Sequence, residues 1–472
     1  MHIELFIGIM AGLLVTYLII GCLVAKKVTS ASDYLLAGKS LSIPAVTATL
    51  LAAQVGGGMF LGTAQNPLHG LLYILGIVLG LLVLGLGFAE KMRHLNVSSI
   101  GEIFEKTYES VGLHHLASAL CILSFLGILI GQILAIKSIL LASAGISSIL
   151  LLSGFWMTIV AYTMIGGFHA AIITDFFRII FIVLVFSGIC IYSLIATKFS
   201  FFSATSFGNV KTIFSQANLS WPQALRLVLI PAGFCLVEQD LAQKLFSART
   251  PRIAGLAALY ASGLLLLFAF VPFYFGIEGQ SLGLDVMKGE NPLIPILTSL
   301  TNTFFFTIAI CGVLSAITST TDSLLCATSS IVSGSVASFF GRSESSILFS
   351  RFVIFITGIA TLIASYFFSE SIIDVLVDSY EIALSALFVP FVFALSIRDF
   401  RKKAAWSAAL TGLFMFFLCK QTSLLLITHY WPSTHSLLIF CHTHASTLTF
   451  SLSTAAYVIG FIYSEKKAQQ AR

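Results

Sequence analysis

The chain has 472 residues, of which 58% are hydrophobic and only 10% are charged, and its mean hydropathy is +1.00. A soluble domain carries about 25% charged residues, so this composition cannot cover a surface that faces water. Many apolar runs have the roughly 20 residues that a helix needs to cross a bilayer. The runs are continuous rather than alternating, which favours helices over a barrel. We therefore predict an all-α integral membrane protein in the lipid bilayer of the cell (inner) membrane.

Several function classes are excluded at this stage. The formal charge of +5 is modest, and it gives no support for nucleic-acid binding. The eight cysteines have no CxxC spacing, so neither a zinc site nor a disulfide framework is predicted. No nucleophile–base pair or cofactor motif is present, so we expect neither an enzyme nor an organic cofactor.

The apolar runs predict about thirteen membrane-spanning helices, taken in chain order. They cover residues 3–25, 42–65, 70–89, 113–142, 146–165, 168–197, 222–247, 253–277, 303–338, 345–368, 371–397, 403–427 and 438–463. The first run is too long for the core of a signal peptide, so we expect a retained helix.

Lysine and arginine predict the orientation. The connections after the odd-numbered spans hold most of them, whereas the other connections hold Lys198, Lys211, Lys288 and Lys420. Since positive charge favours the cytoplasmic side, the N-terminus is expected outside and the C-terminus in the cytoplasm.

Two spans contain residues that interrupt helices. The second span holds Gly56-Gly57-Gly58, and the seventh holds Pro231-Ala232-Gly233. Glycine is unfavourable inside a helix, and proline removes an amide donor. Broken helices at matching places in two halves are typical of transporters built from inverted repeats, with the binding site at the breaks.

Two carboxylates lie inside apolar spans, where an isolated charge is costly and usually meets a cavity, a partner or an ion. Asp175 precedes Arg178 by one helical turn, which also allows a structural ion pair. Asp322 lies in a stretch rich in serine and threonine, and on a helix Ser319, Asp322 and Ser323 share one face. Hydroxyl, carboxylate and carbonyl oxygens are the ligands of a small hard cation.

Four motifs, in order along the chain, carry a family resemblance. DYLLAGKSL (33–41), GGFHAAIITDFFR (166–178), EQDLAQKLFSA (238–248) and LSAITSTTDSLLCATSS (314–330) resemble DYFLAGRSL, GGLxAVxxTDxxQ, DQxxVQRxLAA and LSAAMSSADSxLLAxSS of the sodium:solute symporter family. This family includes sodium–glucose, sodium–proline, pantothenate and choline transporters.

The resemblance implies a LeuT-like fold with two inverted repeats of five helices, each with a broken first helix. The expected parts are an extra N-terminal helix and cytoplasmic loop (1–40), the first repeat (41–200), the second repeat (201–400), and two C-terminal helices with a cytoplasmic tail (401–472).

The resemblance also implies that the chain is a symporter that imports a small organic solute with Na⁺, by alternating access. Matched motif to motif, the sodium ligands are Ala52, Val55, Ala316, Ser319 and Thr320. A second sodium or a proton is expected at Asp175, Asp322 and Ser323, together with Ser319. The alternatives are a choline-type or proton-coupled transporter of the same family, or a sensor with a transporter fold.

The solute is expected at and just after the breaks. The candidate residues are Gln54, Gly57, Met59, Phe60, Phe234 and Glu238. VGGGMFLGTAQ (55–65) looks most like the choline-transporter branch, but Gln54 stands where that branch has tryptophan. Glutamine both donates and accepts, which suits an amino acid, a carboxylate or a sugar.

Two further features have no assigned role. Lys137 lies in the middle of the fourth span, where it snorkels toward the interface or neutralises a carboxylate of the solute. His429, His435, His442 and His444 cluster near an expected outer loop without the spacing of a zinc site.

Overall fold

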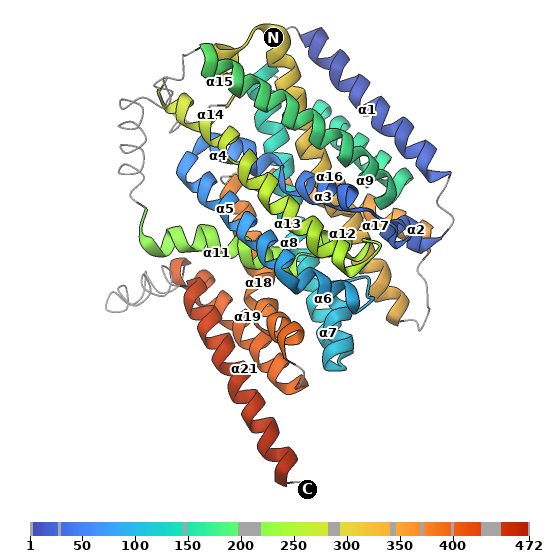
Figure 1. The fold of residues 1–472 in the computed structure, drawn as a ribbon, viewed down its shortest axis with the longest axis vertical. Coiled ribbons are helices and arrows are strands. Elements are labelled where there is room, and N and C mark those ends of the chain that lie inside the picture. The colour runs from blue at the N-terminus through green and yellow to red at the C-terminus, as the bar shows by residue number, and fades with distance from the viewer. Residues whose placement is uncertain are drawn as a thin grey trace.

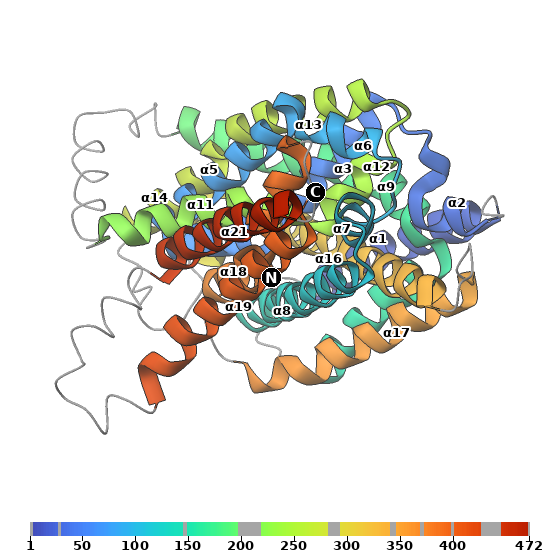
Figure 2. The same cartoon turned by 90° about the horizontal axis from the view of Figure 1, so that it is seen from below.

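The computed structural model describes residues 3–26, 30–144, 149–196, 219–281, 293–339, 346–368, 372–397, 401–425 and 445–470. Within these ranges the chain is built from helices, and the β pairing is limited to one isolated bridge between Leu41 and Ala248. The predicted all-α fold is confirmed. Figures 1 and 2 show long helices packed side by side, with α19 and α21 extending from one end of the bundle.

The elements follow one another as α1 (Ile3–Ala25), α2 (Ala31–Leu36), η1 (Ala37–Lys39), α3 (Ile43–Gln54), η2 (Gly58–Gly62), α4 (Thr63–Gln65), α5 (Pro67–Val83), η3 (Leu84–Phe88), α6 (Ala89–His94), α7 (Ile100–Tyr108), α8 (Val111–Ala144), α9 (Ile149–Ala196), α11 (Trp221–Val237), α12 (Gln239–Phe246), α13 (Pro251–Phe268), α14 (Phe270–Ser281), α15 (Leu293–Leu300), α16 (Thr303–Phe339), α17 (Ile347–Ala364), η6 (Ser365–Phe367), α18 (Ile372–Ser396), α19 (Lys402–Leu425) and α21 (Ala445–Gln470).

Within the described residues, each predicted span falls on one to three consecutive helical elements. Among the described residues, 8 helices are long and apolar enough to cross a membrane, and the bent pair α3 with η2 and α4 brings the number to 9. The thirteen predicted spans exceed this number because α9 holds two of them and because α11, α19 and α21 do not meet the same test.

The break in the second span lies where the glycines predict it. The helical bonding of α3 ends with the amide of Val55 donating to the carbonyl of Leu51, and the chain resumes as η2 at an angle of 50°. A Cβ on Gly56 would lie 2.6 Å from Oγ1 of Thr320, so α16 approaches too closely for any larger residue. The glycines therefore end α3 and also leave room for the close approach of α16.

The break in the seventh span is displaced from its predicted place. The prediction at Pro231-Ala232-Gly233 is wrong, because α11 continues through Pro231 to Val237 and breaks at Glu238, whose φ and ψ are −73° and 115°. A proline removes one amide donor, and packed neighbours allow a membrane helix to continue past it. Gly233 serves packing instead, since a Cβ there would lie 2.9 Å from Cδ1 of Leu384 on α18.

The fifth and sixth predicted spans join without a loop. They form the two halves of α9, which meet at Gly167 with φ 60° and ψ −161°. Only glycine adopts this conformation readily, and a Cβ at this position would lie 2.5 Å from Cε2 of Tyr34. The predicted boundary between residues 165 and 168 therefore corresponds to a kink.

The α3 and α16 helices pack against each other, and each also packs against both α9 and α12. The α1 helix, which precedes the expected repeats, packs on α9 and α16. On the other side, α11 packs against α5 and α18, and α18 also packs against α8. The boundaries of the two repeats stay a prediction, but each predicted repeat begins with a broken helix.

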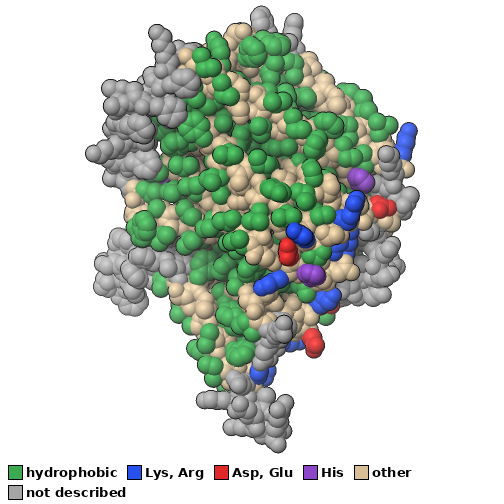
Figure 3. Space-filling model, viewed as in Figure 1, with side chains coloured by type: hydrophobic (Ala, Val, Ile, Leu, Met, Phe, Trp, Pro, Cys, Tyr) green, Lys and Arg blue, Asp and Glu red, His purple; other side chains and the backbone are tan. Residues whose placement is uncertain are grey.

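The surface has the character that a lipid bilayer requires. Hydrophobic side chains cover most of the face in Figure 3, and charged side chains gather toward one end, near α2, α6 and α7. This charged end includes the exposed Lys91 and Lys106. Leu150 and Leu267 are 82% and 74% exposed on the helices, as expected for side chains in contact with lipid.

Gly167→Ala is expected to destabilise the protein by about 1–3 kcal/mol through backbone strain at the kink. The alanine Cβ would also clash with the Tyr34 ring, which adds to this loss. Gly154→Ala is the matched control on the same helix, since a Cβ at Gly154 meets nothing within 4 Å. The measurement is the thermal unfolding of both purified variants in detergent. Equal melting temperatures for the two variants would contradict the role of Gly167.

Candidate functional site

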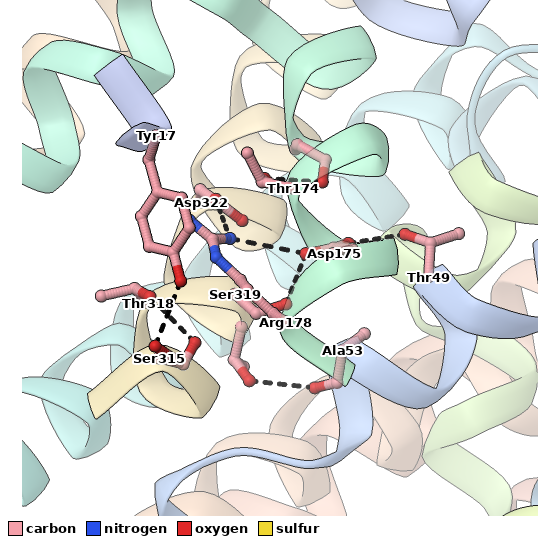
Figure 4. A network of polar contacts seen from close by, with 12 residues as sticks. Tyr17, Thr49, Ala53, Thr174, Asp175, Arg178, Ser315, Thr318, Ser319 and Asp322 are labelled. Carbon is pink, nitrogen blue, oxygen red and sulfur yellow. Dashed lines mark hydrogen bonds and ion pairs between the residues drawn. The ribbon is translucent and has the colours of Figure 1, made fainter. Parts of the chain in front are cut away.

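The end of α3 lies against the polar stretch of α16, as Figure 4 shows. Oγ1 of Thr320 donates to the carbonyl of Ala53 across the two helices at 3.1 Å. The last carbonyls of a helix have no partner within that helix, and they carry the negative end of its dipole. The break therefore presents carbonyl oxygens beside the hydroxyls of α16.

The five predicted sodium ligands are brought to this junction. All are buried, with exposed fractions from 0% to 7%: Ala52, Val55, Ala316, Ser319 and Thr320. Ala52 and Val55 lie at the end of α3, and the other three lie on adjoining turns of α16. Their carbonyl and hydroxyl oxygens form the kind of donor set that a small hard cation takes.

Asp175 adds a carboxylate to the same place from α9. It is fully buried, and Oγ of Ser319 donates to its Oδ1 at 2.5 Å. Oγ1 of Thr49 on α3 donates to its Oδ2 at 2.7 Å. One carboxylate thus joins α3, α9 and α16, and a negative charge lies next to the predicted sodium ligands (Figure 4).

Asp322 is held mainly by Arg178. Nη1 of Arg178 lies 2.6 Å from Oδ2 of Asp322 and 3.5 Å from Oδ1 of Asp175. The hydroxyl of Tyr162 donates to Oδ2 of Asp322 at 2.9 Å and accepts from Nη2 of Arg178 at 2.8 Å. The predicted pair between Asp175 and Arg178 is present, but the shorter ion pair of Arg178 is with the other carboxylate.

Arg178 is enclosed on its remaining side by α1. Its Cζ lies 4.1 Å from the centre of the Tyr17 ring, a cation–π contact, and the Tyr17 hydroxyl shares a hydrogen bond of 3.1 Å with Oγ of Ser315. Oδ1 of Asp322 and Oγ of the neighbouring Ser323 are buried without a hydrogen-bond partner among the described residues. Both carboxylates predicted for a second sodium or a proton therefore contact a guanidinium.

A small cavity of about 20 Å³ lies beside the α3 break. A cavity of this volume holds about one water molecule. Its lining comes from α3, η2, α5, α8, α16 and α18 and from the α11–α12 break: Ala53, Gln54, Gly56, Gly58, Met59, Tyr73, Ile128, Gln132, Glu238, Thr320, Leu324, Leu376 and Tyr380.

Polar groups converge on this cavity. Nε2 of Gln54 donates to Oε2 of Glu238 at 3.3 Å, which links the two helix breaks directly. Oε1 of Gln132 accepts from the amide of Gly57 at 3.3 Å. Larger hollows of about 930 and 820 Å³ have mostly apolar linings, contributed by α9, α15 and α16 in the first case and by α3, α9 and α13 in the second. The small cavity is the better candidate because it combines burial with several polar groups.

The predicted solute residues are placed unequally. Gln54, Met59 and Glu238 line the cavity. The amide of Gly57 donates to Gln132, which lines the cavity. The Phe234 ring stacks on Tyr380, another lining residue, with 4.4 Å between the ring centres. Phe60 lies elsewhere, with its ring 4.3 Å from Phe186 and 6.0 Å from Phe268.

Three polar cavity residues were missed at the sequence level. Tyr73 on α5 and Tyr380 on α18 share a hydrogen bond of 2.8 Å between their hydroxyls. No sequence pattern pairs these residues, which are 307 positions apart. Gln132 was detectable, since it is an uncharged polar residue inside the apolar run GILIGQILAI.

The two features without an assigned role do not join the site. Lys137 is exposed on α8, which fits snorkelling rather than contact with a solute in the cavity. His429, His435, His442 and His444 lie outside the described residues. Within the described residues, no group of three or more His, Cys, Asp or Glu side chains is placed to hold a metal ion.

Solved transporter structures share this architecture. A Na⁺-coupled sialic acid symporter, solved in a substrate-bound outward-open state, aligns with a TM-score of 0.76 at 17% identity over 96% of this chain and 97% of that chain. Mhp1, a nucleobase-cation-symport-1 family transporter, aligns with a TM-score of 0.55 at 14% identity over 90% and 94% of the two chains. At these identities the likeness shows the fold, which is LeuT-like.

Sequence comparison gives the family. The sodium/pantothenate symporter of Escherichia coli (strain K12) is 27% identical over 185 residues, a match that spans 37% of this chain and 38% of that relative. The model of the sodium:solute symporter family matches residues 34–414, which include three of the four motifs in full and the first motif from Tyr34 onward. With its LeuT-like fold, its apolar helices and this match over most of its length, the chain belongs to the sodium:solute symporter family.

Proposed function

We propose that the protein is a sodium-coupled symporter that imports a small organic solute, with one sodium ion bound between the α3 break and α16. The observation that supports it best is the junction itself. The buried end of α3, which holds Ala52 and Val55, meets α16 and α9 here: Oγ1 of Thr320 donates to the carbonyl of Ala53, and Oγ of Ser319 donates to the carboxylate of Asp175. Asp175 shares Arg178 with Asp322, so these three groups keep one net negative charge. Burying that charge is costly, and a bound sodium ion would offset the cost.

The solute is proposed to bind in the cavity between the two helix breaks. This cavity has a volume of only about 20 Å³, so a solute fits only after its walls separate. Walls contributed by the expected first repeat (α3, α5 and α8) face walls contributed by the second (α11, α16 and α18). Rocking of one group of helices against the other would open the cavity to each side in turn.

The lining suggests which groups the solute presents. Glu238 is 7% exposed, and no Lys, Arg or His among the described residues lies within ion-pair distance of its carboxylate. A carboxylate only accepts hydrogen bonds when ionised, so we infer that the solute places an amine or hydroxyl donor beside it. The stacked rings of Phe234 and Tyr380 provide an apolar wall for the remainder.

Ser319→Ala is expected to weaken the apparent affinity for sodium at least about tenfold, or ~1.4 kcal/mol, because one ligand oxygen is lost. The measurement is the melting temperature of the purified protein in liposomes, titrated with NaCl against KCl at constant ionic strength. A ligand that binds only the folded state raises this temperature. Ser333→Ala is the matched control, since Ser333 is buried on the same helix and bonds Ser350 at 2.9 Å. A titration of Ser319→Ala that overlays the wild-type curve would reject the site.

Glu238→Gln is expected to abolish stabilisation by the solute while leaving the sodium shift intact, since Glu238 lines the cavity and is not among the proposed sodium ligands. The same assay in sodium would use a panel of amino acids, pantothenate, choline, sugars and carboxylates. Glu109→Gln, which changes an exposed carboxylate, is the control. A solute that stabilises wild type and Glu238→Gln equally would place the solute elsewhere.

The proposed orientation has the N-terminus outside and the C-terminus in the cytoplasm, supported by the charged end near α6 and α7 (Figure 3). A green fluorescent protein fused after Arg472 should therefore fluoresce in intact cells, and alkaline phosphatase fused at the same position should stay inactive. The opposite pair of results would reverse the proposed orientation.

A further inference from the structure

Arg178 occupies the place where a second coupling ion was expected. The expected second site consists of Asp175, Asp322 and Ser323, and the guanidinium lies between the two carboxylates, at 3.5 and 2.6 Å. Both carboxylates and the guanidinium have side chains that are 0% exposed. The position that a second cation would take is thus filled by a cation of the protein itself.

The guanidinium is fixed by groups from three parts of the chain. It donates to Asp322 and to Tyr162, which belongs to the other half of α9, and its face lies on the ring of Tyr17 from α1. An arginine held on several sides in a buried place does not leave with the transported ions. Arginine also keeps its charge in proteins, so it acts as a permanent cation.

The charges of the site then balance with one sodium ion. Asp175 and Asp322 contribute two negative charges, and Arg178 contributes one positive charge. The next ionisable pair is Lys244 with Asp240 on α12, which is buried at 2.5 Å and neutral as a pair. In the described residues no other ion pair reaches these carboxylates. One sodium ion neutralises the remainder of this three-residue cluster; the carboxylate of Glu238 belongs to the neighbouring cavity and is not part of the cluster.

The motif over residues 166–178 differs from the family pattern at Arg178. GGFHAAIITDFFR ends in Arg178 where the pattern it resembles, GGLxAVxxTDxxQ, ends in a neutral glutamine. We propose that Arg178 permanently replaces a second coupling cation, so that this transporter binds one sodium ion per chain and per transport cycle. This inference rests on the proposed function, since it concerns the number of sodium ions that the same site holds.

The test counts sodium ions without any solute. Purified protein is incubated with saturating ²²Na⁺, and the bound ions per chain are measured by scintillation proximity. Wild type is expected to bind one ion. Arg178→Gln is expected to bind two, because removal of the guanidinium frees Asp322 and Ser323 as ligands and leaves two uncompensated carboxylates. The double variant Arg178→Gln/Asp322→Asn, which restores the original net charge, is expected to bind one.

The outcomes separate the two proposals. Two ions bound by wild type would overturn the role of Arg178 and leave sodium coupling in place. No bound sodium in wild type would reject the proposed function, and this inference with it. A folded Arg178→Gln variant that still binds one ion would also overturn the inference. Because the wild-type count involves no substitution, it decides the question even where Arg178→Gln fails to fold.

Discussion

The structure depends on a buried cluster of charges, Asp175, Arg178 and Asp322, at the centre of the helix bundle. Removing each ion from water costs several kcal/mol, and only close partners offset that cost. Here the partners come from different helices: Thr49 on α3, Tyr162 on the first half of α9, and Ser319 on α16. Since removal of one member of a buried ion pair typically costs about 3–5 kcal/mol, the cluster fixes how these helices lie against one another.

This constraint gives α1 a role beyond that of an added helix. Tyr17 of α1 covers the guanidinium of Arg178 and bonds Ser315 on α16. Water at this position would compete with the ion pairs and screen them. A helix that lies outside both expected repeats therefore completes the low-dielectric environment on which the charge cluster depends.

The sequence predicted the fold and the buried acids well because those signals are local. A carboxylate in an apolar run is conspicuous wherever it lies, and three adjacent glycines end a helix whatever surrounds them. The structure does not test the residue roles that the motifs imply, but it brings most of the predicted residues together. Prediction was weakest for contacts between side chains on different helices. The ion pair between Arg178 and Asp322 joins residues 144 positions apart, and no single-sequence pattern indicates it.

The break between α11 and α12 is a second feature whose position the sequence alone does not predict. Pro231 is the strongest local signal against a helix, yet the helix passes through it and ends at Glu238. The end is set by tertiary contacts: Nε2 of Gln54 bonds the carboxylate of Glu238, and Gln239 accepts a hydrogen bond from the amide of Ile100 at 2.6 Å. Side chains at the break thus find partners that the local sequence does not reveal.

Thr320 lies on both proposed sites, and this supplies a physical basis for coupling them. Its hydroxyl reaches the carbonyl of Ala53 beside the proposed sodium ligands, and its side chain lines the cavity between the helix breaks. Gly56 shares that double position, since it lines the cavity and contacts Thr320. In the proposed function, a sodium ion that draws the α3 break and α16 together would also set the spacing of the cavity walls. The free energy of sodium binding is then available to organise the solute site, and the coupling is reciprocal, as linkage requires.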